Sequence, residues 1–229
     1  MSKQGKTIVA VLAFIVVIIA IIFVVRQGRE TTPSAYTPPT ETPSTPASDT
    51  TSDGTISFSR PADFGLAVTM EQIPVSSYIP PCIEFTYCLY YSGAAYVGSN
   101  FESAGLSILN RSSGPDFSTQ TACLTIQPDG YSGLSPKIAH HTDYAIGVFA
   151  PIGDAAAGHY ANGEEYRLFT DGKCYQFDIR IGETQFANYP AGTIKEFTAS
   201  QRTALLAQLR SMVSGIKLVK SSSTLVLPQ

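Results

Sequence analysis

The chain has 229 residues, a formal net charge of −3 at pH 7 and four cysteines. Lysine and arginine are few and scattered, so the sequence lacks the basic surface that binds a phosphate backbone, and we expect no nucleic-acid partner. Tyrosine and phenylalanine are abundant, with 12 of each, while charged residues make up only 14% of the chain. That composition excludes a chain that is disordered throughout and is typical of a packed, β-rich domain.

Residues 7–26 are predicted to form a transmembrane signal anchor. The stretch from Ile8 to Val25 has 18 apolar residues and no charge, and as a helix it would span roughly 27 Å, close to the hydrocarbon core of a bilayer. A cleaved signal peptide is the main alternative, but its apolar region is shorter, and no small-x-small cleavage site follows Val25. We therefore expect the chain to have the lipid bilayer as a partner through this helix.

Charge does not decide the orientation of the anchor, because Lys3 and Lys6 on one side balance Arg26 and Arg29 on the other. The four cysteines favour an oxidising compartment for the rest of the chain. We therefore expect residues 1–6 to be a cytoplasmic tail and the globular part to lie outside the cytoplasm. The predicted location is the cell membrane, in a single-pass, N-in/C-out topology.

Residues 27–55 are predicted to be a disordered linker. From Thr31 to Asp53, 17 of 23 residues are Thr, Ser or Pro. Such a segment cannot bury a core, and its prolines favour an extended, semi-rigid spacer. The folded domain is therefore expected to comprise residues 56–229, held away from the membrane by a stalk. The alternative is a linker without a spacing role.

Strands dominate the expected domain. Alternating apolar residues, or runs of β-branched and aromatic ones, predict strands in five segments: Ile56–Phe58, Leu66–Met70, Phe85–Tyr91, Leu106–Leu109 and Tyr144–Phe149. The segment Ser118–Ile126 fits either a helix or a strand.

The strongest local prediction is a hairpin around Asp171-Gly172, the residue pair preferred in type I′ turns. A two-residue turn fixes the register, so Leu168 faces Tyr175 and Tyr166 faces Phe177 on one side of the ribbon. The opposite side carries the pairs Phe169 with Cys174, Arg167 with Gln176, and Glu165 with Asp178. We expect the aromatic side to be buried and the polar side to face solvent.

A helix is predicted near the carboxyl terminus. Thr198 to Gln201 has the pattern of a capping box, and five apolar residues follow on one helical face: Leu205, Leu206, Leu209, Met212 and Val213. Gly215 is expected to end the helix in the left-handed conformation, and Ile216–Val219 to form a last strand. Strands that precede one docked helix and a return strand predict an α+β domain.

Both ends of this domain resemble those of the Mog1/PsbP-like domains. Phe58-Ser59-Arg60-Pro61 is similar to their opening F-x-x-P strand, and Ser214-Gly215-Ile216-Lys217-Leu218 is similar to their closing helix-to-strand segment. The resemblance implies helices packed against a curved antiparallel sheet and a non-enzymatic adaptor or binding role. It transfers no functional residue to this chain, and the stretch from Pro74 to Tyr91 has no counterpart in it.

The cysteines Cys82, Cys88, Cys123 and Cys174 are predicted to form two disulfides. No C-x2-C pair is present, so their spacing argues against zinc. In the hairpin, Cys174 lies on the polar side, where a disulfide would protect its thiol. We favour Cys123 with Cys174 and Cys82 with Cys88; the other connectivities, and reduced cysteines in a cytosolic domain, stay open.

Two groups of polar residues are candidate sites. Asp154, His159 and Tyr160 lie in a segment rich in small residues and are predicted to form a binding loop, with a flexible, solvated connection as the alternative. The second group is a charge network of Glu165 and Asp178 with Arg167 and Arg180. Its members are expected to be surface charges, because the two arginines offset the like charges that the hairpin places opposite each other.

The function expected from these features is that of a membrane-tethered, extracytoplasmic binding or scaffold domain of the cell envelope. Its partner would be an envelope protein or polymer. No nucleotide, metalloprotease or serine-hydrolase motif occurs in the sequence, so we expect no catalytic residue, metal or cofactor. The alternative is a tethered hydrolase that uses His159 with Asp154, or the Glu165/Asp178 pair.

Overall fold

The structure is a computed structural model of the chain, and it describes residues 47–74, 78–112, 115–220 and 223–228. The predicted anchor at 7–26 and most of the predicted linker lie outside these residues. Within the described part of the chain, no helix is long and apolar enough to cross a membrane.

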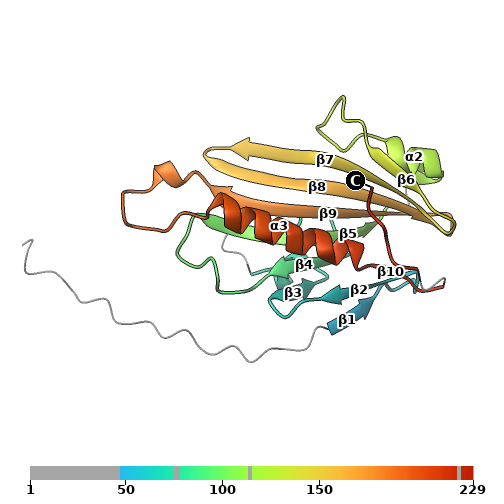
Figure 1. Cartoon of the computed structure of the whole chain (residues 1–229), viewed down its shortest axis with the longest axis horizontal. Coiled ribbons are helices and arrows are strands. Elements are labelled where there is room, and N and C mark those ends of the chain that lie inside the picture. Colours follow the sequence, from blue (N-terminus) through green and yellow to red (C-terminus); the bar gives the residue numbers. More distant parts are fainter. Residues whose placement is uncertain (1–46, 75–77, 113–114, 221–222, 229) are drawn as a thin grey trace, which may run out of the picture. The chain divides into compact units, whose positions relative to one another are not determined.

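Two antiparallel sheets form the body of the domain (Figure 1). The larger has seven strands in the order β3-β4-β5-β9-β8-β7-β6: β3 (Phe64–Ala67), β4 (Tyr87–Tyr91), β5 (Phe101–Asn110), β6 (Lys137–His140), β7 (Ala145–Ala156), β8 (His159–Thr170) and β9 (Lys173–Thr184). The smaller has the order β1-β2-β10: β1 (Ala47–Thr50), β2 (Ile56–Arg60) and β10 (Lys217–Leu218). Each of the five predicted strands overlaps an observed one.

Two α-helices and three short 3₁₀ turns complete the described residues: α2 (Gln120–Thr125), α3 (Ala199–Ser214), η1 (Met70–Gln72), η2 (Pro115–Phe117) and η3 (Phe186–Asn188). The segment that fitted either a helix or a strand is therefore helical at α2. The hydroxyl of Thr119 caps this helix by accepting a hydrogen bond from the amide of Ala122. The α+β class predicted from the sequence is confirmed.

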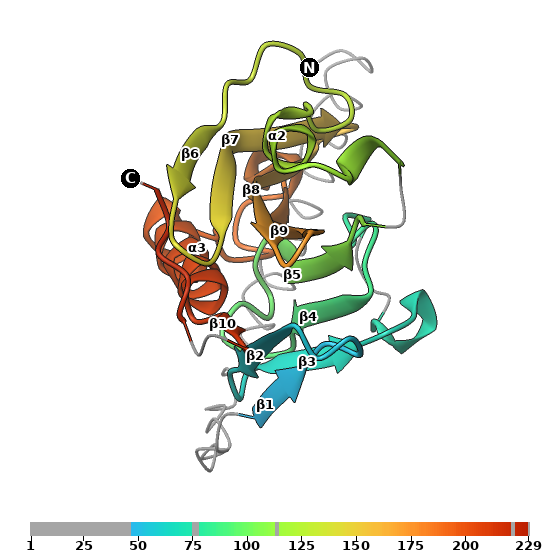
Figure 2. The same ribbon diagram turned by 90° about the vertical axis from the view of Figure 1, so that its right-hand side faces the viewer.

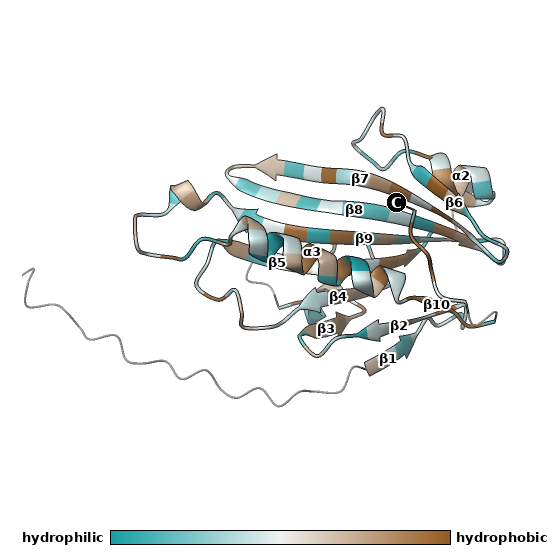
Figure 3. Cartoon of the chain, in the orientation of Figure 1, coloured by the Kyte–Doolittle hydropathy of each residue, from teal (hydrophilic) through white to brown (hydrophobic). Residues whose placement is uncertain are grey.

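The predicted hairpin is the centre of the large sheet. Asp171 and Gly172 have φ angles of 51° and 70°, as a type I′ turn requires, and Tyr166 pairs with Phe177 in the predicted register. Both strands are longer than predicted, because β8 begins at His159 and β9 continues to Thr184. Figure 3 shows hydrophobic and hydrophilic residues alternating along β9, because successive side chains point to opposite faces of the sheet.

The main core lies between the sheet and α3. Figure 2 shows α3 on one side of the large sheet and α2 on the other. The core contains the rings of Tyr166, Tyr175 and Phe177, which are at most 2% exposed. From α3 the residues Leu205, Leu209, Met212 and Val213 are buried, as the helical pattern predicted, and Leu206 packs at the edge.

The two ends of α3 differ in how well the sequence predicted them. The capping box of Thr198 and Gln201 is present, as expected. Gly215 is in the right-handed region, with φ −79° and ψ −3°, so the expected left-handed stop is wrong. The amide of Gly215 still donates a hydrogen bond to the Ser211 carbonyl. The helix ends there because the chain then turns into β10.

The folded part begins earlier than the predicted boundary at Ile56. Ala47–Thr50 forms strand β1, which pairs with β2, so the last residues of the predicted linker 27–55 are structured. The side chain of Asp53 holds this segment to the hairpin: it accepts hydrogen bonds from the Tyr175 hydroxyl and, at 2.9 Å, from Lys173 Nζ. A Ser/Thr-rich composition did not reveal these long-range partners.

Acid should weaken this attachment. Burial alone would raise the pKa of Asp53, but hydrogen bonds from Tyr175, Lys173 and Thr51 outweigh it and lower the pKa below its usual range. Its ionised form therefore stabilises the fold above about pH 4, and that stabilisation is lost as the pH falls. We expect urea unfolding to show a steeper loss of stability below about pH 4 in the wild type than in Asp53→Asn. Parallel slopes would contradict this role.

Candidate functional site

The structure contains two disulfides, Cys82–Cys88 and Cys123–Cys174, which is the connectivity favoured from the sequence. Each one ties a covering segment to the face of the large sheet opposite α3. Cys123 belongs to α2 and Cys174 to β9, while Cys82 precedes β4 and Cys88 lies within it. The two covering segments therefore stand over the same face of the sheet.

A glycine allows one covering segment to lie directly on the sheet. A Cβ atom at Gly105 in β5 would lie 2.8 Å from the carbonyl oxygen of Pro81, which is closer than real side chains come. The neighbouring Ile79 carbonyl accepts a hydrogen bond of 2.5 Å from the Ser103 hydroxyl. The segment before β4 is thus held against the backbone of the sheet without intervening side chains.

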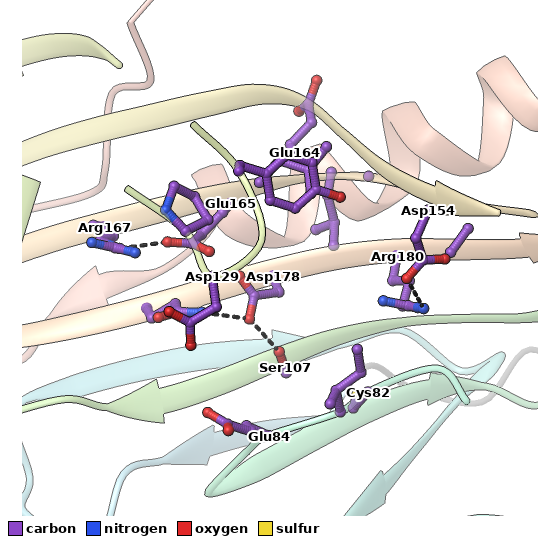
Figure 4. Close-up of a pocket in the computed structure, with 18 of the residues that line it drawn as sticks. Cys82, Glu84, Ser107, Asp129, Asp154, Glu164, Glu165, Arg167, Asp178 and Arg180 are labelled. Atoms are coloured by element: carbon purple, nitrogen blue, oxygen red, sulfur yellow. Dashed lines mark hydrogen bonds and ion pairs between the residues drawn. The ribbon is translucent and has the colours of Figure 1, made fainter. Parts of the chain in front are cut away.

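Between the covering segments lies a cavity of about 600 Å³ (Figure 4). Its floor is the sheet, where Ala161 of β8 carries only a methyl group. Gly163 lets β8 lie close to β9, because a Cβ atom there would come within 1.9 Å of the Ile179 carbonyl oxygen. Its walls include Pro81 to Glu84 on one side and Ile126 to Asp129, which follow α2, on the other. A volume of this size matches sites for small molecules in other proteins.

The predicted charge network lines this cavity and is not a surface feature. Glu165 and Arg167 are 5% and 2% exposed, and they form an ion pair. Arg167 also donates to the Ile126 carbonyl at 2.6 Å and lies over the ring of Phe117. We expected the polar side of the hairpin to face solvent, which was wrong because α2 and the residues after it cover this face. The register of the hairpin shows which residues share a face but not whether another segment packs on it.

Asp178 is held by polar neighbours rather than by a cation. Its Oδ2 accepts hydrogen bonds from Gln176 Nε2 at 2.8 Å and from the Ser107 hydroxyl at 3.2 Å. Gln176 in turn accepts one from Arg111 Nε at 2.8 Å. The other oxygen, Oδ1, is inaccessible to solvent and has no partner among the described residues. Asp178 pairs directly with Glu165 across β8 and β9.

The pKa of each of the two facing carboxyl groups is raised. Burial and the neighbouring Asp178 carboxylate raise the pKa of Glu165 to about 7, although Arg167 opposes the shift. Burial also raises the pKa of Asp178, against the hydrogen bonds from Gln176 and Ser107. Near neutral pH, this pair can therefore take up or release a proton as its surroundings change.

Stability should consequently fall as the pH rises through this range. A glutamate in the unfolded chain has its ordinary pKa of 4.5, so between that pH and about 7 the folded state keeps a proton on Glu165 that the unfolded chain has released. We expect Glu165→Gln to flatten the decline in the free energy of unfolding across that interval, measured by urea titrations at several pH values. An unchanged slope would show that Glu165 is not the group that titrates.

The other predicted group, Asp154, His159 and Tyr160, does not form a loop. Strand β7 continues to Ala156 and β8 starts at His159, so only a two-residue turn separates them. The small residues 154–157, taken as a flexible connection, are mostly extended strand. They pair with β8, where Ala155 faces Tyr160.

His159 and Asp154 have separate partners. His159 Nδ1 lies 2.8 Å from Glu102 Oε1, and its ring stacks on Tyr78 at 4.2 Å. Asp154 forms an ion pair of 3.0 Å with Arg180 at the cavity. Tyr160 bonds to Gln185 at 3.3 Å. The structure therefore brings Asp154 to the charge network and leaves His159 outside the cavity lining, so the His159/Asp154 dyad of the hydrolase alternative is not formed.

Several cavity residues were not expected from the sequence. Arg111, Ser107 and Phe117 come from β5 and the segment after it, which the hairpin argument did not reach. The available signal was the small residue at alternate positions in the middle of β5, at Ser103, Gly105 and Ser107, of which Gly105 and Ser107 share the face of Asp178. Without the order of the strands, that pattern could not be assigned to a face.

Comparison with known proteins gives a fold resemblance and nothing more specific. No family model and no curated protein matches the chain. Among solved structures, the Ran-binding protein Mog1p of Saccharomyces cerevisiae is similar, with a TM-score of 0.42 and 12% identity over 79% of this chain and 99% of that one. This weak similarity is to a Mog1 protein, and the two ends of the domain resemble Mog1/PsbP-like domains in sequence.

Proposed function

We propose that the chain is a membrane-tethered, extracytoplasmic ligand-binding domain of the cell envelope, without enzymatic activity. The observation that carries this proposal is the cavity of about 600 Å³ with charged side chains in its walls and a floor of small residues. Burying charged groups costs free energy, so stability alone does not account for their concentration at one cavity, and a few polar groups that converge on a cavity are a common feature of binding sites.

The location rests on two further features. Both disulfides fit an oxidising compartment outside the cytoplasm. The apolar stretch from Ile8 to Val25 would hold the chain in the bilayer, and the Thr/Pro-rich segment after it would separate the domain from the membrane surface. An envelope protein or polymer then remains the expected source of the ligand.

The binding role can be tested with the full-length protein in detergent micelles. The chain would be incubated with a small-molecule extract of cell envelopes, re-isolated, and analysed by mass spectrometry for co-purifying compounds. Ile83 lines the cavity and is 59% exposed, so Ile83→Trp should narrow the site without disturbing the core. Val97 is 79% exposed and is not among the lining residues, so Val97→Trp is the matched control.

We expect compounds that are retained by the wild type and by Val97→Trp and are depleted at least tenfold by Ile83→Trp. Equal retention by all three proteins would place the binding elsewhere. An absence of retained compounds from every extract would remove the support for a binding role.

A tethered hydrolase is the second candidate, and only one of its two forms remains. Glu165 and Asp178 face each other beside the cavity, and a carboxyl group with a pKa of about 7 is suited to proton transfer. Hydrolysis of nitrophenyl glycosides or esters by the full-length protein, abolished in Glu165→Gln, would support this function over binding alone. Activity that persists in that variant would come from another source.

A further inference from the structure

Carboxylates outnumber guanidinium groups around the cavity. Three arginines line it, and each pairs with one carboxylate: Arg111 with Glu84, Arg167 with Glu165, and Arg180 with Asp154. Glu164 points away, since its side chain pairs with Arg210 of α3 on the other face. Among the residues that the structure describes, three carboxylates therefore have no arginine partner: Asp178 beside the floor, and Asp116 and Asp129 where the lining is exposed.

The clearest shortage of positive charge is at the facing pair. Glu165 is only 5% exposed, and among the described residues only one of its carboxylate oxygens accepts a hydrogen bond, from Arg167. Asp178 Oδ1 is buried without a partner in the part of the chain that the structure describes. Cross-strand partners have their Cβ atoms about 5 Å apart, so both carboxyl groups are within reach of one small cation. A single cationic group could satisfy both.

An organic ammonium fits this environment better than a metal ion. An ammonium group has three donors and is satisfied by a few acceptors, whereas calcium takes about six to eight oxygen ligands. Within the described residues, no group of three or more His, Cys, Asp or Glu side chains is arranged to hold a metal. The rest of the lining offers apolar contacts for a ligand body, from Phe117, Ile152 and Tyr131.

We propose that the cavity binds its ligand through a protonated amine placed at Glu165 and Asp178, with the apolar part of the ligand against Phe117 and Ile152. This inference rests on the proposed ligand-binding function and adds the chemical class of the ligand. Binding would draw both carboxyl groups into their ionised forms, because a nearby positive charge favours them. One proton would leave the pair as the cation enters.

Other charged groups also act on this pair and have to be included in its test. Arg167 comes from the same strand as Glu165, Arg180 comes from the strand of Asp178, and Arg111 directly follows β5. The acidic groups around the cavity are Glu84, Asp116, Asp129 and Asp154. The three arginines limit the affinity for a cation, while the carboxylates at the rim attract a cation from solution. The test must therefore distinguish this long-range attraction from direct contact with Glu165 and Asp178.

The test is isothermal titration calorimetry of the full-length protein in detergent with three probes of matched shape: 2-phenylethylamine, 2-phenylethanol and 3-phenylpropanoate. We expect the amine to bind at least tenfold more tightly than the alcohol and the anion not to bind. At pH 6 the observed enthalpy for the amine should depend on the ionisation enthalpy of the buffer, because a proton is released.

Three isosteric variants locate the contact. Asp178→Asn and Glu165→Gln should each weaken amine binding at least tenfold, whereas Asp116→Asn, which changes an exposed carboxylate of the lining, should change it less than threefold. Equal losses in all three variants would mean diffuse attraction at the rim and would overturn the proposal. Thermal unfolding curves of each variant establish that the fold is kept.

The outcomes separate this inference from the binding function itself. Equal binding of the amine and the alcohol, sensitive to Ile83→Trp, would leave a ligand-binding cavity without amine recognition. If envelope compounds are retained in the extract experiment but 2-phenylethylamine does not bind in the calorimeter, the cavity would again bind ligands without recognising an amine. Failure of both experiments would remove the ligand-binding function together with the inference.

Discussion

Phe177→Ala is expected to lower the free energy of unfolding by about 3 to 5 kcal/mol, the usual cost of removing a buried aromatic ring. Phe177 is fully buried, pairs across the hairpin with Tyr166, and belongs to the core between the sheet and α3. Removing its ring would leave a cavity at the point where the central strands meet the helix. Urea unfolding followed by tyrosine fluorescence measures the change.

The matched control is Phe186→Ala, because Phe186 is 40% exposed in the short turn η3. We expect this variant to change stability by less than about 1 kcal/mol. If the exposed ring proved to be the more important one, the assignment of the aromatic side of the hairpin to the core would be wrong.

Removal of the Cys123–Cys174 disulfide is the second change with a large expected effect. The bridge closes a loop of 51 residues, and the loss of this cross-link from the unfolded chain should cost about 4 kcal/mol. The double variant Cys123→Ala/Cys174→Ala also removes the covalent link between α2 and the sheet. Urea unfolding of this variant, compared with that of the oxidised wild type, measures the loss.

The second disulfide provides a control for the loop-length argument. Cys82 and Cys88 are separated by only six positions, so the same reasoning gives a cost of about 2 kcal/mol for Cys82→Ala/Cys88→Ala. We expect the long-range bridge to contribute more. The reverse order would mean that local packing around each sulfur, rather than chain entropy, determines the contribution of these bridges.

The sequence predicted the hairpin well because its information is local. Asp171-Gly172 selects one turn, and the turn determines which residues face each other over all of β8 and β9. The same local reasoning placed Glu165 opposite Asp178 correctly. It could not say whether that side of the ribbon meets water, because burial depends on how α2 packs over it. The Cys123–Cys174 bridge was favoured from the sequence, but a bridge alone does not show that the helix covers the face.

The errors in the candidate site have one physical origin. His159 and Asp154 are close in sequence, and the small residues between them resembled a flexible loop. In the structure those residues are paired strand, so each side chain finds a distant partner, Glu102 or Arg180. Asp53 is similar: its Ser/Thr-rich neighbours predicted a linker, but Tyr175 and Lys173 hold it.

The two disulfides have a consequence for the speed of binding. Each wall of the cavity is joined covalently to a strand of the large sheet, through Cys82–Cys88 on one side and Cys123–Cys174 on the other. Walls fixed in this way limit the rearrangement that can accompany ligand entry. A compound that fits should therefore associate in a single kinetic phase, at a rate that rises linearly with its concentration and never saturates at a slow opening step.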